Sequence, residues 1–121
     1  MSTPLEVQIF GVRKSADTRK AQRFFSERRI RAHFIDLQER PMAETELRRF
    51  VDRFGLKALI DETSKRYTEL GLHHANLSDS RWLERLMSEP LLLRMPLVRR
   101  LGKPPAVTIG DAEEIWRSWI S

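Results

Sequence analysis

The chain has 121 residues, with 22 Lys and Arg against 17 Asp and Glu, a formal net charge of +5, and no cysteine. This length fits one domain, so we predict a single domain spanning 1–121. Without cysteine the chain cannot form disulfides, thiolate nucleophiles or cysteine-ligated zinc and iron–sulfur sites. Its apolar stretches fall short of the roughly 20 residues that a membrane span needs. The opening Met1–Leu5 lacks signal-peptide features, and we expect a cytoplasmic protein without membrane association.

The first third predicts a strand, a helix and a second strand. A short apolar run at Val7–Phe10 ends at a glycine, which is typical of a buried strand. Residues 15–28 have helical periodicity, and Ile30–Asp36 alternates as a strand does. Two such strands around a helix are expected to run parallel, with a right-handed crossover. The side chains predicted to face inward are Ala21, Phe24, Phe25, Ala32 and Phe34, with Ile30 as a further candidate.

The middle of the chain, about 41–90, predicts a helical insertion. Pro41 suits the start of a helix, and Gly55 suits its end. Short helical pieces are expected over 57–70, before Gly71. Ser78 or Ser80 would cap a third helix that ends before a proline. The apolar faces predicted for the two longer helices are Leu47, Phe50, Val51 and Phe54, then Trp82, Leu83, Leu86 and Met87.

The last third predicts a hairpin and a helix. Strands are expected at Leu97–Val98 and Ala106–Ile109, joined by a turn rich in Gly and Pro. Asp111 and Glu114 have the spacing of a capping box for the final helix. Its predicted inward residues are Ala112, Ile115, Trp116 and Trp119.

Residues 9–21, Ile-Phe-Gly-Val-Arg-Lys-Ser-Ala-Asp-Thr-Arg-Lys-Ala, resemble the opening of the arsenate reductase (ArsC), Spx and YffB family. The resemblance continues through Glu27–Asp36, through Ser64–Leu72 with its Leu-Gly-Leu, and through Leu77–Asp79 followed by Glu89–Val98. It covers nearly the whole chain in collinear order. It implies a thioredoxin-like α/β fold, with a mixed four-stranded sheet flanked by helices and a helical insertion.

The resemblance also shows what this chain has lost. Family members carry a reactive cysteine at the start of the first helix, and some carry a second one three residues later. These positions fall on Ser15 and Thr18 here. A family arginine before the Ser-Lys segment is replaced by Glu62-Thr63. The arginine that directly precedes a key cis-proline is Met95, with Arg94 one residue earlier and Pro96 as that proline.

Ser15 has three interpretations. A helix cap is the simplest, because serine is a preferred N-cap residue. A retained pocket for an oxyanion or glutathione would use Arg13, Lys14, Ser15, Arg94 and Pro96 at a helix N-terminus that attracts anions. Serine catalysis would need a base and an orienting group. Thr18 is expected to be an exposed residue of the first turn, where Asp17 would repel an anion.

The other chemistry-bearing residues favour no further site. His33 lies on the second predicted strand, and His73-His74 lies in the insertion without the i, i+3 or i+4 spacing of a metal motif, so no metal is expected. Basic residues cluster around the first helix and suit an acidic protein or a phosphate backbone, without a motif for reading nucleic-acid sequence. They are Arg13, Lys14, Arg19, Lys20, Arg23, Arg28, Arg29 and Arg31.

The function predicted from these features is that of a redox-inactive binding or regulatory protein. Because Spx-type members bind RNA polymerase, the resemblance implies RNA polymerase or another protein as the partner. The alternative is an arsenate reductase-like or glutathione-linked oxidoreductase that uses a thiol supplied by another molecule. A stability or assembly module without any small ligand is a third reading.

Overall fold

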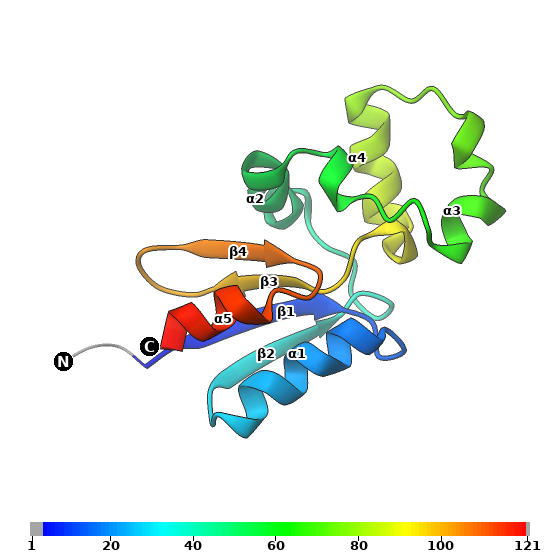
Figure 1. The fold of residues 1–121 in the computed structure, drawn as a ribbon. Helices are drawn as coiled ribbons and strands as arrows, with labels where there is room; N and C mark the ends of the chain where they lie inside the picture. Colours follow the sequence, from blue (N-terminus) through cyan, green and yellow to red (C-terminus); the bar gives the residue numbers. More distant parts are fainter. Residues whose placement is uncertain (1–3, 121) are drawn as a thin grey trace. The chain divides into compact units, whose positions relative to one another are not determined.

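A computed structural model describes residues 4–120 (Figure 1). Residues 1–3, on which part of the signal-peptide expectation rests, lie outside that range. No helix within residues 4–120 is both long and apolar enough to cross a membrane. The elements in chain order are β1 (Glu6–Gly11), α1 (Ala16–Glu27), β2 (Arg31–Asp36), α2 (Glu44–Phe54), η1 (Lys57–Leu59), α3 (Lys65–Glu69), η2 (Leu72–His74), α4 (Asp79–Ser88), η3 (Pro90–Leu92), β3 (Leu97–Arg100), β4 (Ala106–Ile109) and α5 (Glu113–Ile120), where η marks a 3₁₀ turn.

The chain divides into two compact units, which we describe separately. The sheet unit consists of the residues up to Arg40 together with those from Met95 onward. The helical unit is the continuous segment Pro41–Arg94. It therefore interrupts the sheet unit between its second and third strands.

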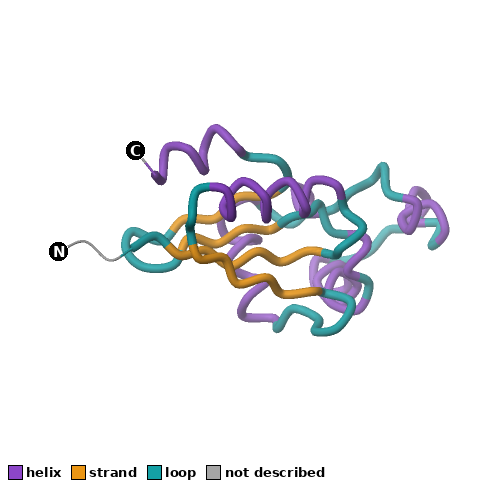
Figure 2. Tube along the Cα trace, turned by 90° about the horizontal axis from the view of Figure 1, so that it is seen from below, coloured by secondary structure: helices purple, strands orange, loops and turns teal. Residues whose placement is uncertain are grey.

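The sheet unit has the mixed four-stranded sheet that the sequence predicts. The strand order is β2-β1-β3-β4, with β1 and β2 parallel and the other neighbours antiparallel. Helices α1 and α5 lie on one face of this sheet (Figure 2). In the registers, Gly11 lies opposite Asp36 and Phe10 lies opposite Leu97.

The core of the sheet unit forms between the sheet and these two helices. Trp116 of α5 is fully buried, and its ring centroid lies 5.6 Å from that of Phe24 and 5.5 Å from that of Phe25. Its indole Nε1 donates a 2.8 Å hydrogen bond to the buried hydroxyl of Thr108. The strands contribute Val7, Ile9 and Val98, and Ala21 completes the cluster.

The helical unit is built from short elements with local caps. Ser64 and Ser78 accept hydrogen bonds from the backbone N–H groups at the starts of α3 and α4, so Ser78 is the cap of the third predicted helix. Gly55 and Gly71 adopt positive φ angles of 85° and 66° where α2 and α3 end. The fully or nearly fully buried side chains include Leu47, Phe50, Leu59, Leu86, Leu92 and Leu93.

Two predictions for the final helix are wrong in detail. Ile115 was expected to face inward, but it is 51% exposed because it precedes the buried Trp116 on a different side of the helix. The helix also begins at Glu113, later than a capping box starting at Asp111 requires. The Asp111 carboxylate instead accepts the backbone N–H of Glu113 at 3.4 Å.

Candidate functional site

Ser15 lies at the start of α1, where it caps the helix as predicted. Its backbone is extended, with φ −75° and ψ 120°, and its hydroxyl accepts a 3.2 Å hydrogen bond from the N–H of Thr18. The Ser15 N–H in turn donates to the carbonyl of Val12 at 3.1 Å. The hydroxyl that occupies the position of the family's sulfur therefore satisfies a backbone donor at the helix terminus.

Arg13 lies in the loop before Ser15 and pairs with Asp36. The Arg13 Nε donates to Asp36 Oδ2 at 3.1 Å, and the Asp36 side chain is only 8% exposed. The sheet brings the two residues together, because β1 and β2 are parallel and their last residues, Gly11 and Asp36, lie side by side. Sequence reasoning missed Asp36 as the partner of Arg13, although both residues follow or end adjacent parallel strands. One face of the proposed anion pocket is thus already neutralised by a carboxylate.

The remaining residues of this loop are exposed to different degrees. Lys14 is exposed, and Asp17 lies in the first turn of the helix. The Arg19 guanidinium donates to the carbonyl of Arg13 at 2.8 Å and so braces the loop against α1. The loop is therefore held in place by Arg19 of α1 and by the ion pair of Arg13 with Asp36 of β2.

Thr18 is buried, and its predicted exposure is wrong. The residue has no exposed surface, and it shares the inner face of α1 with Ala21 and Phe25. A methyl group placed on Gly11 would overlap the Thr18 side chain. Within residues 4–120, the Thr18 hydroxyl is the buried side-chain polar atom without a hydrogen-bond partner. The spacing of 18, 21 and 25 is the signal that could have predicted this burial.

Pro96 begins the approach to β3 and follows a cis peptide bond, as the resemblance implies. Its carbonyl accepts the Gly110 N–H at 2.9 Å. Leu97, the first residue of β3, pairs with Phe10 near the end of β1, so Pro96 lies beside the end of β1. The sheet thus places Pro96 at the same end of the strands as the loop that carries Arg13 and Ser15.

Arg94 belongs to the helical unit and bonds to that unit's backbone. Its Nε donates to the Ala58 carbonyl at 3.1 Å, and its Nη2 donates to the Ile60 carbonyl at 3.4 Å. The nearby Glu62-Thr63 stretch forms a turn in which the Thr63 N–H and hydroxyl both donate to Asp61 Oδ1. The guanidinium of Arg94 is thus used as a structural donor to carbonyls.

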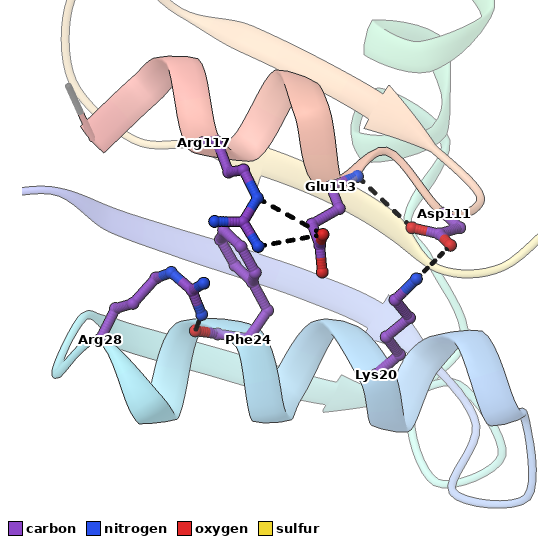
Figure 3. Close-up of polar contacts among 6 residues, drawn as sticks. All are labelled: Lys20, Phe24, Arg28, Asp111, Glu113 and Arg117. Atoms are coloured by element: carbon purple, nitrogen blue, oxygen red, sulfur yellow. Dashed lines mark hydrogen bonds and ion pairs between the residues drawn. The ribbon is translucent and has the colours of Figure 1, made fainter.

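Lys20 and Asp111 form a short ion pair within the sheet unit (Figure 3). The Lys20 Nζ lies 2.6 Å from Asp111 Oδ2, and the pair joins α1 to the turn before α5. The hydrogen bond with Lys20 lowers the pKa of Asp111, and the same bond raises the pKa of Lys20. Sequence reasoning missed this pair, because the two residues are 91 positions apart and the motifs that contain them do not encode their contact.

The arrangement around Ser15 supplies little for catalysis. His33 lies on β2 opposite Gln8, well before the end of the strand, and its Nε2 is 3.2 Å from Glu6. His73 and His74 belong to the helical unit, where the His73 ring packs on Tyr67. No group of three or more His, Asp or Glu side chains within residues 4–120 has metal-binding geometry. Within the sheet unit, His33 is therefore held on β2 beside Glu6 and does not contact Ser15.

Comparisons with known proteins agree with this architecture. The model of the ArsC family matches residues 10–119. No curated protein matches the sequence significantly. A solved structure of a protein named YFFB superposes with a TM-score of 0.82 at 16% identity, over 95% of this chain and 99% of that one.

Two further solved structures carry family descriptions. An arsenate reductase from Vibrio cholerae superposes with a TM-score of 0.68 at 23% identity, over 79% of this chain and 84% of that one. An ArsC-related protein from Brucella melitensis superposes with a TM-score of 0.67 at 21% identity, over 96% and 95%. These likenesses confirm the fold class. With the family match over residues 10–119, they establish that this cysteine-free chain belongs to the ArsC family.

Proposed function

We propose that this chain is a redox-inactive member of the ArsC family that works as a binding or regulatory protein through a protein partner. The observation that carries the proposal is the use of Ser15. Its oxygen takes the place of the family's reactive sulfur and accepts the N–H of Thr18 as a helix cap. A serine hydroxyl cannot cycle between thiol and disulfide, and no cysteine elsewhere in the chain can replace it.

The charged residues of the predicted anion pocket support the same conclusion. Arg13 is paired with the buried carboxylate of Asp36, and Arg94 donates to two backbone carbonyls. Asp17 adds a negative charge in the first turn of α1. An oxyanion bound at this site would have to compete with each of these groups.

The partner is expected to be acidic and to meet this chain in the cytoplasm. The net charge of +5 favours encounter with anionic surfaces. RNA polymerase, which Spx-type relatives bind, is a specific candidate. No cofactor and no sequence-specific nucleic-acid binding is expected under this proposal.

An arsenate reductase-like activity with an external thiol is the second candidate. It is favoured by the preserved helix terminus at Ser15 and the cis bond before Pro96, which lie at one edge of the sheet. In such a reaction two glutathione molecules would supply two electrons to arsenate and leave as their disulfide. Arsenite and water would be the products.

One experiment with two controls distinguishes the two candidate functions. Purified chain is incubated with millimolar arsenate and glutathione, and arsenite is quantified against a protein-free blank and against Ser15→Ala. We expect the chain and the variant to match the blank. A rate above the blank that Ser15→Ala abolishes would sink the proposal and establish the second candidate.

The binding role is measured with defined components. The immobilised chain captures partners from a cell extract, with an unrelated protein of equal net charge as the matched control. A partner retained by this chain alone is then purified and titrated. We expect saturable binding at physiological salt, and binding that disappears at 150 mM salt for every partner would contradict a specific role.

A further inference from the structure

The open edge of the sheet at β2 combines an unpaired strand with a groove of mixed apolar and polar lining. β2 is the first strand in the order β2-β1-β3-β4, and β1 is its sole strand neighbour within residues 4–120 (Figure 1). Beside this edge, an open groove of about 460 Å³ runs between β2 and α1. The residues that line it are Gln22, Ser26, Ile30, Ala32 and Phe34.

The backbone of β2 has hydrogen-bonding groups directed toward this edge. The Leu37 N–H donates to the Gly11 carbonyl of β1 at 2.9 Å. Backbone groups in a strand alternate between its two neighbours, so Ile35 and His33 also face β1. The N–H and carbonyl groups of Ala32 and Phe34 therefore face the open edge, where an added strand would pair with them.

The groove is lined by apolar side chains of β2 and the turn before it, and by polar side chains of α1. Ile30, Ala32 and Phe34 are half-buried, and they pack on the edge of the cluster that contains Phe24 and Phe25. Gln22 and Ser26 of α1 line the groove beside them. A side chain projecting from an added strand onto this face would contact Ala32 and Phe34 and lie beside these two polar side chains.

The charges around this edge are predominantly positive. Arg29 and Arg31 are exposed, and neither has a carboxylate partner within residues 4–120. At the other end, the Arg13 guanidinium lies 5.5 Å from the centre of the Phe34 ring and is 70% exposed. Asp36 and Glu39 face Arg13, and Glu6 faces His33, so the acidic groups near this edge are already engaged.

We infer that β2 binds an extended acidic segment of a partner protein as a fifth strand. Apolar side chains of that segment would lie in the groove over Ala32 and Phe34. Its alternate side chains would project to the opposite face, beside Arg31 and His33, where carboxylates are favoured. This is strand addition, in which backbone pairing supplies affinity and alternate side chains supply specificity. The inference rests on the proposed function, because it assigns a surface to the protein partner.

A second copy of this chain suits the edge poorly. It would bring another net charge of +5 and a second set of these arginines to the interface. The observations thus favour a partner of opposite charge, and self-association is an outcome that the experiment can register.

The experiment uses a fluorescein-labelled ten-residue peptide that alternates valine and glutamate, titrated into the full chain and followed by anisotropy. Three controls define the mode of binding. A valine–lysine peptide of the same length tests charge, and a valine–glutamate peptide with alternate N-methylated amides tests backbone pairing. The third is sedimentation of the free chain at the highest concentration used.

We expect saturable binding of the valine–glutamate peptide alone. Arg31→Glu should weaken it about fivefold or more, on the scale of a close charge reversal. Arg49→Glu, an exposed residue of the helical unit with the same change in net charge, should alter it by less than about twofold. In hydrogen exchange, the amides of Ala32 and Phe34 should be protected by the peptide, while that of Ile35 should be unchanged.

Equal binding of the valine–lysine or the N-methylated peptide would overturn the inference. So would a free chain that dimerises through β2, or a peptide that protects other amides. If a natural partner binds the chain and Arg31→Glu equally well, strand addition at β2 fails while the binding function stands. If arsenite forms in a Ser15-dependent manner, the proposed function fails whatever the peptide does.

Discussion

The two units of this molecule have internal cores of different kinds. The sheet unit joins segments from both ends of the chain, and its core converges on the fully buried ring of Trp116. The helical unit is one continuous segment, and its buried residues are mainly leucines spread over α2, α4 and three short 3₁₀ turns. The core of the sheet unit is thus arranged around one large aromatic side chain, while the core of the helical unit consists of smaller side chains from several short elements.

Polar contacts follow the same division. In the sheet unit, buried polar groups lie inside the core, where Thr108 accepts from Trp116 and Thr18 has no partner. In the helical unit, an ion pair with two hydrogen bonds lies nearer the surface. Arg66 donates through Nε and Nη2 to the two carboxylate oxygens of Glu89, at 2.9 and 2.8 Å. The comparison indicates that single substitutions in the core will affect the sheet unit more than the helical unit.

The largest effect is expected from Trp116→Ala. Removing a fully buried tryptophan costs about 3–5 kcal/mol, through lost apolar burial and the cavity that remains. Here it also removes the partner of the Thr108 hydroxyl. The free energy of unfolding, measured by urea titration and far-UV circular dichroism, should fall by an amount in the upper part of that range.

Leu86→Ala tests the other half of the comparison. Leu86 is 1% exposed in the helical unit, and Leu→Ala substitutions in cores cost about 2–5 kcal/mol. Because the leucine core is distributed, we expect a value near the lower end. Ile115→Ala, at a half-exposed position of α5, is the surface control and should stay within about 0.5 kcal/mol of the wild type. A loss for Leu86→Ala larger than that for Trp116→Ala would break the comparison.

Thr18 and Thr108 should respond in opposite directions to the same change. In Thr18→Val the methyl group replaces a buried hydroxyl that has no partner, so the free energy of unfolding should rise by about 1 kcal/mol. In Thr108→Val the indole N–H of Trp116 loses its acceptor, so stability should fall by about 1–3 kcal/mol. Thermal unfolding by calorimetry measures both.

This pair of variants is its own control, because both exchange one buried hydroxyl for a methyl group in the same unit. A destabilised Thr18→Val would mean that the hydroxyl has a bound water or another partner. In that case the interior of the sheet unit would be fully satisfied, and the contrast with the helical unit would weaken.

Much of the fold could be predicted from local patterns. The alternation in 31–36, the helical spacing of Leu47 and Phe50, and the glycines at 55 and 71 each act over a few residues. The structure has the corresponding elements at these places. Ser15 as a helix cap was likewise readable, since capping depends on the residue type and the next turn.

The errors and omissions concern contacts between distant segments. Asp36 as the partner of Arg13 and Asp111 as the partner of Lys20 depend on how strands and helices pack, which no local pattern encodes. The exposure of Ile115 depends on the rotation of α5 over the sheet. Thr18 was misjudged because its hydroxyl suggested solvent, while its position in the 18, 21, 25 stripe determined its burial.

The smallest effects are expected from the two ion pairs, and they depend on pH. Hydrogen bonds from Arg66 and from Lys20 lower the pKa values of Glu89 and Asp111 in the folded chain. A carboxylate with a lowered folded pKa contributes stability above its unfolded pKa, near 4, and loses it as pH falls through the folded value. Glu89→Gln and Asp111→Asn should therefore lower the melting temperature at pH 7 and converge with the wild type as the pH falls through the lowered pKa values.

The two effects should differ in size, since the Glu89 side chain is 25% exposed and accepts two bonds from one guanidinium, while that of Asp111 is 39% exposed and accepts one bond from Lys20 and a long one from the Glu113 N–H. Glu89→Gln should lower the melting temperature by about 3 °C and Asp111→Asn by about 1 °C, on the scale of partly exposed pairs. Lys20 and Arg66 have raised pKa values, so their side of each pair stays charged up to about pH 10 and adds nothing to the acid transition. A larger effect for Asp111→Asn than for Glu89→Gln would mean that the ion pair between α1 and the turn before α5 stabilises the sheet unit more than the Arg66–Glu89 pair stabilises the helical unit. The expected order of the two ion pairs would then have to be reversed.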